Sequence, residues 1–211
     1  MKEEKSGYTI KFQSESSVLS DCSPVRFTPI FCSRLTSDGL EIIMKCLCFS
    51  DSHGFCSFFK KALELHPDAE VVFFLGDGLA DAESLAEKYT DKAWLMVRGN
   101  CDYSSVSLGR AVEKTEAITL MGKRIVYTHG DLYGVKYGEE GLLRLAESRG
   151  ADIVLFGHTH TPFEKYVPRE EGGVYLFNPG SIQAPAYDRG GSYGVIDITE
   201  SGVCFSHGSF T

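Results

Sequence analysis

Short apolar segments alternate with helix-length amphipathic segments from Met44 onward, and this order limits the folds open to the chain. The apolar segments at 44–50, 70–75 and 93–97 are typical of buried strands, and helices are expected at 54–66 and near 81–89. One apolar stripe on the first helix consists of Phe55, Phe58, Phe59, Ala62 and Leu63. The β-α-β-α-β order predicts an α/β fold with a largely parallel sheet whose faces are covered.

The second half of the chain is richer in strands. Residues 117–128 predict a hairpin that turns at Met121-Gly122, and a helix at 139–149 precedes a strand at 152–156. Further strands are expected at 163–167, 174–178, 193–198 and 202–206, with one turn at Gly172-Gly173.

Polar side chains follow five of these strands at their C-terminal ends. The five groups are Asp51-Ser52-His53-Gly54, Gly76-Asp77-Gly78, Gly99-Asn100-Cys101-Asp102, His129-Gly130 and Gly157-His158-Thr159-His160. Because open α/β sheets bind ligands at the carboxyl ends of their strands, we expect these side chains to meet at one rim. Their carboxylates, imidazoles and amide oxygen are the mixed N/O donors that suit Mn²⁺, Fe²⁺, Zn²⁺ or Ni²⁺.

Each motif has a plainer explanation when taken alone. An Asp-x-His-Gly segment is usually a turn, and a Gly-Asp pair after a strand is often a helix N-cap. The distribution of histidine argues against chance, since four of the six histidines lie at these strand ends. Only His66 and His207 fall elsewhere, and an ordinary surface position is expected for both. The pattern as a whole therefore favours a functional site.

Residues 1–43 differ from the rest of the chain. They are rich in Ser and Thr and show no sustained helix or strand period. We interpret 1–43 as a poorly ordered N-terminal extension, or a stretch upstream of the true start, and 44–211 as the working domain. The alternative is that some apolar residues of this stretch, Val25, Phe27, Ile30 and Phe31, pack on the domain.

Composition limits the partners and the compartment. The net charge of −8 provides no electrostatic footprint for nucleic acid, which disfavours a nuclease. No segment reaches the ~18 apolar residues of a membrane span, and the N-terminus lacks the apolar core of a signal peptide. The seven cysteines include no CxxC spacing, which favours reduced thiols and a cytoplasmic protein. A homo-oligomer is left open.

The order of the strand-end motifs resembles that of the calcineurin-like metallophosphoesterases. The family motifs D-x-H, G-D, G-N-x-[D/E], H-G and G-H-x-H all occur between Asp51 and His160, and Asn178-Pro179-Gly180-Ser181 extends the match. The resemblance covers 44–211 and is strongest to the small YfcE-type phosphodiesterase branch. It implies a two-sheet β-sandwich flanked by helices, with a metal site at the C-terminal ends of the strands.

The resemblance also implies a dinuclear metal site. One ion would be held by Asp51, His53 and His160, the other by Asn100, His129 and His158, and Asp77 would bridge them. Mn²⁺ is the expected metal, with Fe²⁺, Ni²⁺ or Zn²⁺ as alternatives. A hydroxide shared by the ions would attack phosphorus in line, so the implied activity is hydrolysis of a small phosphoester, most of all a phosphodiester.

Other residues near the motifs have open roles. Cys101 occupies a position where many larger relatives have a histidine thought to protonate the leaving oxygen, so with Asn100 and His129 it is an expected catalytic residue; alternatively, it only fills the turn. Asp131 would orient an imidazole or repel an anionic substrate, and Asp102 would cap or orient the Asn100 loop. The segment 178–181 is expected to form a tight turn, with substrate contact as the alternative.

A scaffold is the alternative to an enzyme. The retromer complex has a subunit similar to this fold that works as a scaffold and has lost much of the ligand set. All seven ligand-type residues are present in this chain, which favours the enzyme.

Overall fold

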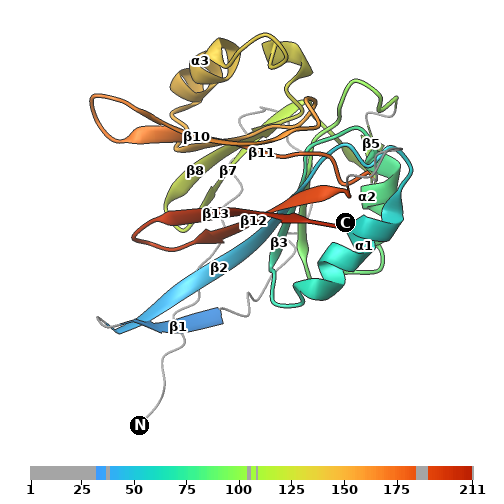
Figure 1. The fold of residues 1–211 in the computed structure, drawn as a ribbon, viewed down its shortest axis with the longest axis horizontal. Helices are drawn as coiled ribbons and strands as arrows, with labels where there is room; N and C mark the ends of the chain where they lie inside the picture. The colour runs from blue at the N-terminus through green and yellow to red at the C-terminus, as the bar shows by residue number, and fades with distance from the viewer. Residues whose placement is uncertain (1–31, 37–38, 104–105, 108, 184–189, 211) are drawn as a thin grey trace.

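Two β-sheets stack face to face in the computed structural model, with helices on both outer faces (Figure 1). The structure describes residues 32–36, 39–103, 106–107, 109–183 and 190–210. One sheet has the strand order β13-β12-β2-β3-β4, with β1 paired to β2, and the other has the order β10-β11-β9-β8-β7. The predicted two-sheet sandwich flanked by helices is confirmed.

The first sheet is mixed rather than largely parallel. It contains β1 (Cys32–Thr36), β2 (Gly39–Phe49), β3 (Val71–Phe74), β4 (Ala93–Met96), β12 (Ser192–Ile198) and β13 (Val203–Ser209). Strands β2, β3 and β4 are parallel, as predicted, but β12 pairs antiparallel with β2 and with β13. The expectation of a largely parallel sheet is therefore wrong here, because the C-terminal hairpin returns beside the first parallel strand.

The second sheet is built from β7 (Thr115–Leu120), β8 (Lys123–Thr128), β9 (Ile153–Leu155), β10 (Pro162–Pro168) and β11 (Gly173–Pro179). Its three central strands are parallel, and β7 and β10 are antiparallel edges. The predicted hairpin turn is confirmed, since Met121 and Gly122 both have positive φ, as a two-residue turn between twisted strands requires. The ribbon of β5 (Val106–Ser107) and β6 (Arg110–Ala111) and the 3-10 helix Asp131–Tyr133 were not expected.

In the described part of the chain, three α-helices cover the outer faces. Helices α1 (Cys56–Leu65) and α2 (Leu79–Ala86) pack on the first sheet, and α3 (Glu140–Arg149) packs on the second (Figure 1). Phe59, Ala62 and Leu63 of the predicted stripe are buried. Phe55 precedes the helix and is 49% exposed, so its place in the stripe is wrong.

Strand β2 is apolar from Cys46 to Phe49 because both of its faces are buried there. Cys46 and Cys48 face the layer between the two sheets, whereas Leu47 and Phe49 pack with Phe59 under α1. Alternation between two apolar layers explains why this segment shows no polar face in the sequence. The buried strand thereby fixes the position of the loop that begins after Phe49.

The predicted division at residue 43 falls within a strand. β2 begins at Gly39 rather than at Met44, and β1 also lies inside the predicted extension. Residues 1–31, including the four apolar residues proposed to pack on the domain, lie outside the described residues. The division therefore stays a prediction. Within the described part of the chain, every helix is too short or too polar to cross a bilayer.

Candidate metal centre

The loops after β2, β3, β4, β8 and β9 bring their polar side chains together from both sheets. Three groups form, and the ligand atoms within each lie within 4.8 Å of one another: Asp51, His53 and His160; Asp77, His129 and His158; His53, Asp77 and Cys101. Asp77 and His53 each belong to two groups and so connect them. The single rim predicted from the strand ends is thus present, and Asp77 has the central position that a bridging ligand needs.

Backbone strain is concentrated in the same loops. Six described non-glycine residues have positive φ; one is Met121 in the hairpin turn, and the others are Asp51, His53, Asp77, His158 and His160. Each such conformation costs on the order of 1–3 kcal/mol, and it persists where surrounding contacts enforce it. These strained backbone conformations lower the stability of the fold, and they fix the directions in which the five side chains point.

In the first group, one carboxylate oxygen faces two imidazoles. The side chain of Asp51 is fully buried, and its Oδ2 accepts a hydrogen bond from the backbone N–H of His158 at 3.1 Å. Its Oδ1 has no hydrogen-bond partner among the described residues, and it lies 3.1 Å from His160 Nε2 and 3.8 Å from His53 Nε2. A buried carboxylate oxygen left without a partner is costly, and a cation between these three atoms would satisfy it.

In the second group, the tautomer of His129 prepares it as a ligand. Its Nδ1–H donates to the carbonyl oxygen of Leu75 at 2.8 Å, and a carbonyl can only accept. In the neutral imidazole, Nε2 therefore carries the lone pair. It lies 3.2 Å from Asn100 Oδ1, 3.1 Å from His158 Nδ1 and 3.4 Å from Asp77 Oδ2. Several acceptors that converge on one point are the arrangement of a metal site with a supporting hydrogen bond behind the ligand.

Electrostatic coupling within the second group favours the ionised carboxylate. Burial opposes the charge on Asp77, but the hydrogen bond and charge of His129 and the N–H of Cys101, 2.7 Å from Oδ1, hold the pKa of Asp77 well below its usual range. The same carboxylate outweighs burial and raises the pKa of His129. Hydrogen bonding to Asp77 also raises the pKa of the Cys101 thiol, which keeps this thiol protonated.

The pKa values of the two histidines in the loop after β9 shift in opposite directions. The Asp51 carboxylate, with Oδ1 3.1 Å from His160 Nε2, raises the pKa of His160. Burial and the neighbouring His129, with a contribution from Lys136, lower the pKa of His158. Since metal binding requires a deprotonated imidazole, a divalent cation would replace the proton that Asp51 favours on His160.

Asp102, whose role the sequence left open, organises two loops through four backbone N–H groups. Its Oδ2 accepts hydrogen bonds from the N–H groups of Asp77 and Gly99, and its Oδ1 accepts from those of Gly78 and Leu79, all at 2.8–2.9 Å. The carboxylate thus ties the loop after β4 to the loop after β3. This agrees with the predicted orienting role and extends it to the Asp77 loop.

Asp81 supports the first loop in a similar way, and the sequence reasoning missed it. Its Oδ2 accepts hydrogen bonds from Ser52 Oγ at 2.6 Å and from the backbone N–H of Gly54 at 2.8 Å. The partners are separated by more than 25 positions in the chain, so no local pattern marks this contact.

A tight turn was predicted for the segment 178–181, but Asn178 and Pro179 still belong to β11, and the segment braces the histidine loop. Asn178 is buried; its Oδ1 accepts from the N–H of Gly180, and its Nδ2 donates to the Gly157 carbonyl and to Thr159 Oγ1. Ser181 Oγ donates to the Asp51 carbonyl at 2.7 Å. The segment therefore supports the site through hydrogen bonds to the loops that carry Asp51 and His158. Substrate contact by this segment stays a prediction.

Asp131 pairs with a lysine. Its Oδ2 accepts a hydrogen bond from Lys114 Nζ at 2.8 Å, and the described residues show no hydrogen bond between Asp131 and an imidazole. His66 and His207 lie outside the three ligand groups, where they contact the Tyr193 hydroxyl and the Asn178 carbonyl. The ligand roles proposed for the seven residues, and the acid role of Cys101, stay predictions.

Residues 44–201 match the model of the calcineurin-like phosphoesterase superfamily domain. Phosphodiesterase YfcE of Escherichia coli K12 is 31% identical over 174 residues, which cover 74% of this chain and 88% of that protein. A predicted phosphoesterase from Streptococcus pneumoniae TIGR4 has a similar structure, with a TM-score of 0.64, 25% identity and coverage of 79% of this chain and 90% of that one.

A vacuolar protein sorting protein has a similar fold. Vps29 of Entamoeba histolytica, solved in complex with Zn²⁺, matches with a TM-score of 0.58 and 22% identity over 80% of this chain and 100% of that one. At this identity the likeness shows the fold alone. The family model, the YfcE relative and the ligand-type residues at the strand ends together show that the chain belongs to the calcineurin-like phosphoesterase superfamily.

Proposed function

We propose that the protein is a dinuclear metal-dependent phosphodiesterase that hydrolyses small phosphoesters. The observation that carries the proposal is the way the groups connect: Asp77 belongs to the His129 group and also lies with His53, and His53 belongs to the Asp51 group. The YfcE relative, a phosphodiesterase by name, supports the diester preference.

The residues fit two divalent cations. Asp51, His53 and His160 would hold one, Asn100, His129 and His158 the other, and Asp77 would be shared. Bound there, the ions would acidify water and stabilise negative charge on phosphoryl oxygens. The donor set favours Mn²⁺, with Fe²⁺, Ni²⁺ or Zn²⁺ as alternatives. With the two carboxylates against two divalent charges, the site keeps about +2, which attracts a phosphoester to a chain of net charge −8.

Other residues of the chain orient the candidate ligands, and one can donate a proton to the leaving oxygen. Leu75 fixes His129 through Nδ1, Asp102 fixes the Asp77 and Gly99 turns, and Asn178 fixes the loop of His158. Cys101 is exposed, is hydrogen-bonded to Asp77 and keeps its proton, so it is the proposed donor to the leaving oxygen.

Hydrolysis assays test the proposal directly. Bis(4-nitrophenyl) phosphate and 4-nitrophenyl phosphate would be compared with each of the four metals, using the wild type, Asp77→Asn and His129→Ala. Metal-dependent release of 4-nitrophenolate, faster from the diester and lost in both variants, is expected. His66→Ala is the matched control, since this histidine lies outside the ligand groups and its removal should leave turnover unchanged.

An interaction module is the alternative function, because Vps29 proteins share the fold. Absence of metal-dependent hydrolysis from all esters, in folded protein with Asp77 and His129 intact, would favour that alternative over the enzyme.

A further inference from the structure

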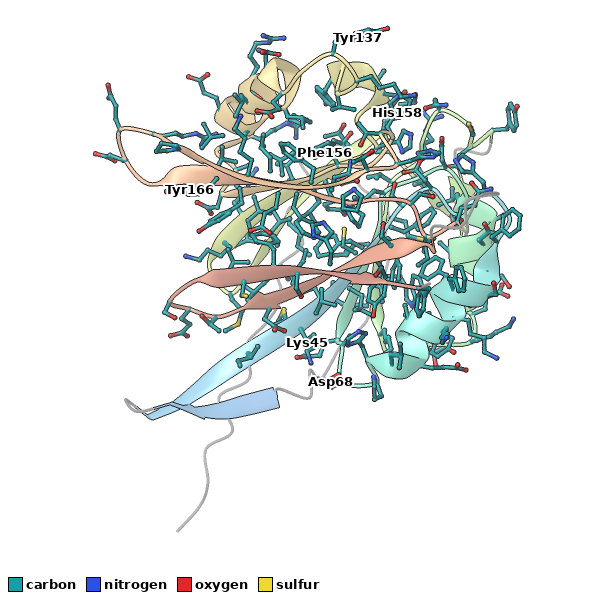
Figure 2. All side chains as sticks on the ribbon, in the orientation of Figure 1. Lys45, Asp68, Tyr137, Phe156, His158 and Tyr166 are labelled. Atoms are coloured by element: carbon teal, nitrogen blue, oxygen red, sulfur yellow. The ribbon has the colours of Figure 1, made fainter. Side chains whose placement is uncertain are left out.

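A cavity of about 250 Å³ lies against the loop that carries His158 and His160. Val135, Leu142, Phe156 and Phe163 supply its apolar wall, and Thr159 and Thr161 form the side toward the histidine loop. In Figure 2, Phe156 lies between α3 and the second sheet, with His158 further along toward the rim of loops. We call this cavity the arm pocket.

The arm pocket shares residues with the loops of the candidate metal centre. Thr159, part of its lining, is the residue between His158 and His160, and Val135 packs on Gly130, the residue after His129. One wall of the pocket thus belongs to the same loops that aim three candidate ligands.

The polar atoms in the lining are already engaged within the protein. Thr159 Oγ1 accepts from Asn178 Nδ2 at 3.0 Å, and Thr161 Oγ1 donates to the Thr159 carbonyl at 3.3 Å. The Glu139 carboxylate pairs with Lys165 Nζ at 2.6 Å. The wall is therefore suited to an apolar occupant, and Glu139 disfavours a second anionic group.

The volume limits the size of that occupant. A cavity of about 150 Å³ lined by apolar side chains holds benzene, so about 250 Å³ accommodates one substituted ring or a short alkyl chain. Phe156 and Phe163, in edge-to-face contact with ring centroids 5.9 Å apart, offer aromatic surface to a planar ring.

We propose that the arm pocket binds an apolar ester group of the substrate, so that the preferred substrates are phosphodiesters with an aryl or short alkyl arm. The inference rests on the proposed phosphodiesterase function. Cys101, the proposed proton donor to the leaving oxygen, lies with His53 and Asp77 and does not line the pocket. The arm in the pocket is therefore the ester group that remains on phosphorus.

The kinetic test keeps the leaving group constant and varies the other arm. Phenyl 4-nitrophenyl phosphate and methyl 4-nitrophenyl phosphate both release 4-nitrophenolate, and we expect kcat/KM to favour the phenyl ester by about ten- to a hundredfold. Val135→Phe fills the pocket and should remove at least about tenfold of this preference for the phenyl ester over the methyl ester.

Two further variants make the result specific. Val203→Phe is the matched control. Val203 is a partly buried valine of the first sheet, at the end away from the ligand-bearing loops, so this substitution should leave the phenyl-to-methyl ratio unchanged. Phe163→Ala enlarges the pocket and should raise kcat/KM for a naphthyl arm relative to phenyl. A phenyl-to-methyl ratio that is the same in wild type, Val135→Phe and Phe163→Ala overturns the arm pocket.

A binding measurement separates the pocket from the proposed function. Benzylphosphonate and methylphosphonate contain P–C bonds that a phosphoesterase does not cleave, and their affinities for Mn²⁺-loaded protein can be compared by calorimetry. Benzylphosphonate should bind at least about tenfold more tightly, and Val135→Phe should abolish the difference. Equal affinities overturn the arm pocket, whereas failure of the wild type to hydrolyse either ester overturns the proposed function alone.

Discussion

Asp102 Oδ2 accepts a hydrogen bond from the backbone N–H of Asp77 at 2.8 Å, and this contact joins two loops that are separated by a strand. Three more backbone N–H groups, from Gly78, Leu79 and Gly99, donate to the same carboxylate. Asp102 belongs to none of the candidate ligand groups among the described residues. Its contribution is to fix where Asp77 and Asn100 point.

Asp102→Asn should therefore weaken both the fold and the site. Asparagine has an NH₂ group in place of one carboxylate oxygen, and this group cannot accept a hydrogen bond from a backbone N–H. At least one of the four hydrogen bonds is therefore lost at a partly buried position. We expect a loss of about 2–4 kcal/mol in the free energy of unfolding, and at least about a tenfold loss of metal-dependent kcat/KM. Asp91→Asn, on an exposed side chain, should change stability by less than about 0.5 kcal/mol. Equal unfolding midpoints in denaturant for Asp102→Asn and wild type would argue against this role.

Gly99→Ala tests how closely the loops approach. A Cβ at Gly99 would lie 2.1 Å from Asp77 Oδ1 and 2.7 Å from the Asp77 backbone nitrogen, so the loop must move. We expect a cost of about 1–3 kcal/mol in stability and a large loss of Mn²⁺ affinity, measured by titration. Gly202→Ala is the control, because a Cβ there meets no heavy atom within 4 Å. The account is wrong on this point if both variants bind Mn²⁺ like the wild type.

The strand-end motifs could be predicted from the sequence because their information is local. A strand that ends in glycine and a ligand-type side chain is visible within a few residues, and the parallel order of β2, β3 and β4 follows from the helices between them. The same local logic identified the turn at Met121-Gly122. For these elements, short-range pattern and final structure agree.

The pairing of distant strands, and the hydrogen bonds by which distant residues hold the ligand loops, could not be predicted in this way. The antiparallel entry of β12 beside β2 joins Gly194 to Cys48, and no local pattern specifies such a distant partner. Asp81 and Asp102 look like ordinary turn carboxylates in the sequence, and their roles arise from hydrogen bonds across more than twenty positions. Phe55 has the right spacing for the helix stripe, but the helix begins one residue later.

Cys101 should matter most for poor leaving groups. Its thiol remains protonated because its hydrogen bond to Asp77 raises its pKa, and it can donate this proton to a leaving oxygen. Cys101→Ala should lower kcat for an alkyl leaving group by at least about tenfold, and that for 4-nitrophenolate by less than about threefold. Cys101→Ser is the conservative partner and should recover part of the alkyl rate. Equal, small losses on both classes of ester would remove Cys101 as the acid.

The stability of the fold should fall between pH 4.5 and 7 because of Glu70. Both of its carboxylate oxygens are buried without a hydrogen-bond partner, and burial raises the pKa of Glu70 from 4.5 to about 7. The folded state then binds more protons than the unfolded state in this range, so stability decreases as the pH rises through it. Below pH 4.5 the carboxyl is neutral in both states, and no penalty remains.

Glu70→Gln should remove this penalty. At pH 8 we expect a gain of about 1–2 kcal/mol, discounted for the partial exposure of the side chain, or about 2–8 °C in Tm. The gain should vanish near pH 4, measured by thermal unfolding at both pH values. Glu171→Gln, on an exposed turn, serves as the control without a pH-dependent difference. A pH-independent change for Glu70→Gln would contradict the role of ionisation.

Metal stoichiometry tests the central claim most directly. Chelator-stripped protein would be dialysed to equilibrium against Mn²⁺, and bound metal per chain would be measured by mass spectrometry for the wild type and Asp77→Asn. Because Asp77 is the proposed bridging ligand between the two positions, we expect about two Mn²⁺ ions per wild-type chain and a loss from both positions in the variant. Wild-type protein that binds no more Mn²⁺, Fe²⁺, Ni²⁺ or Zn²⁺ than Asp77→Asn would contradict it.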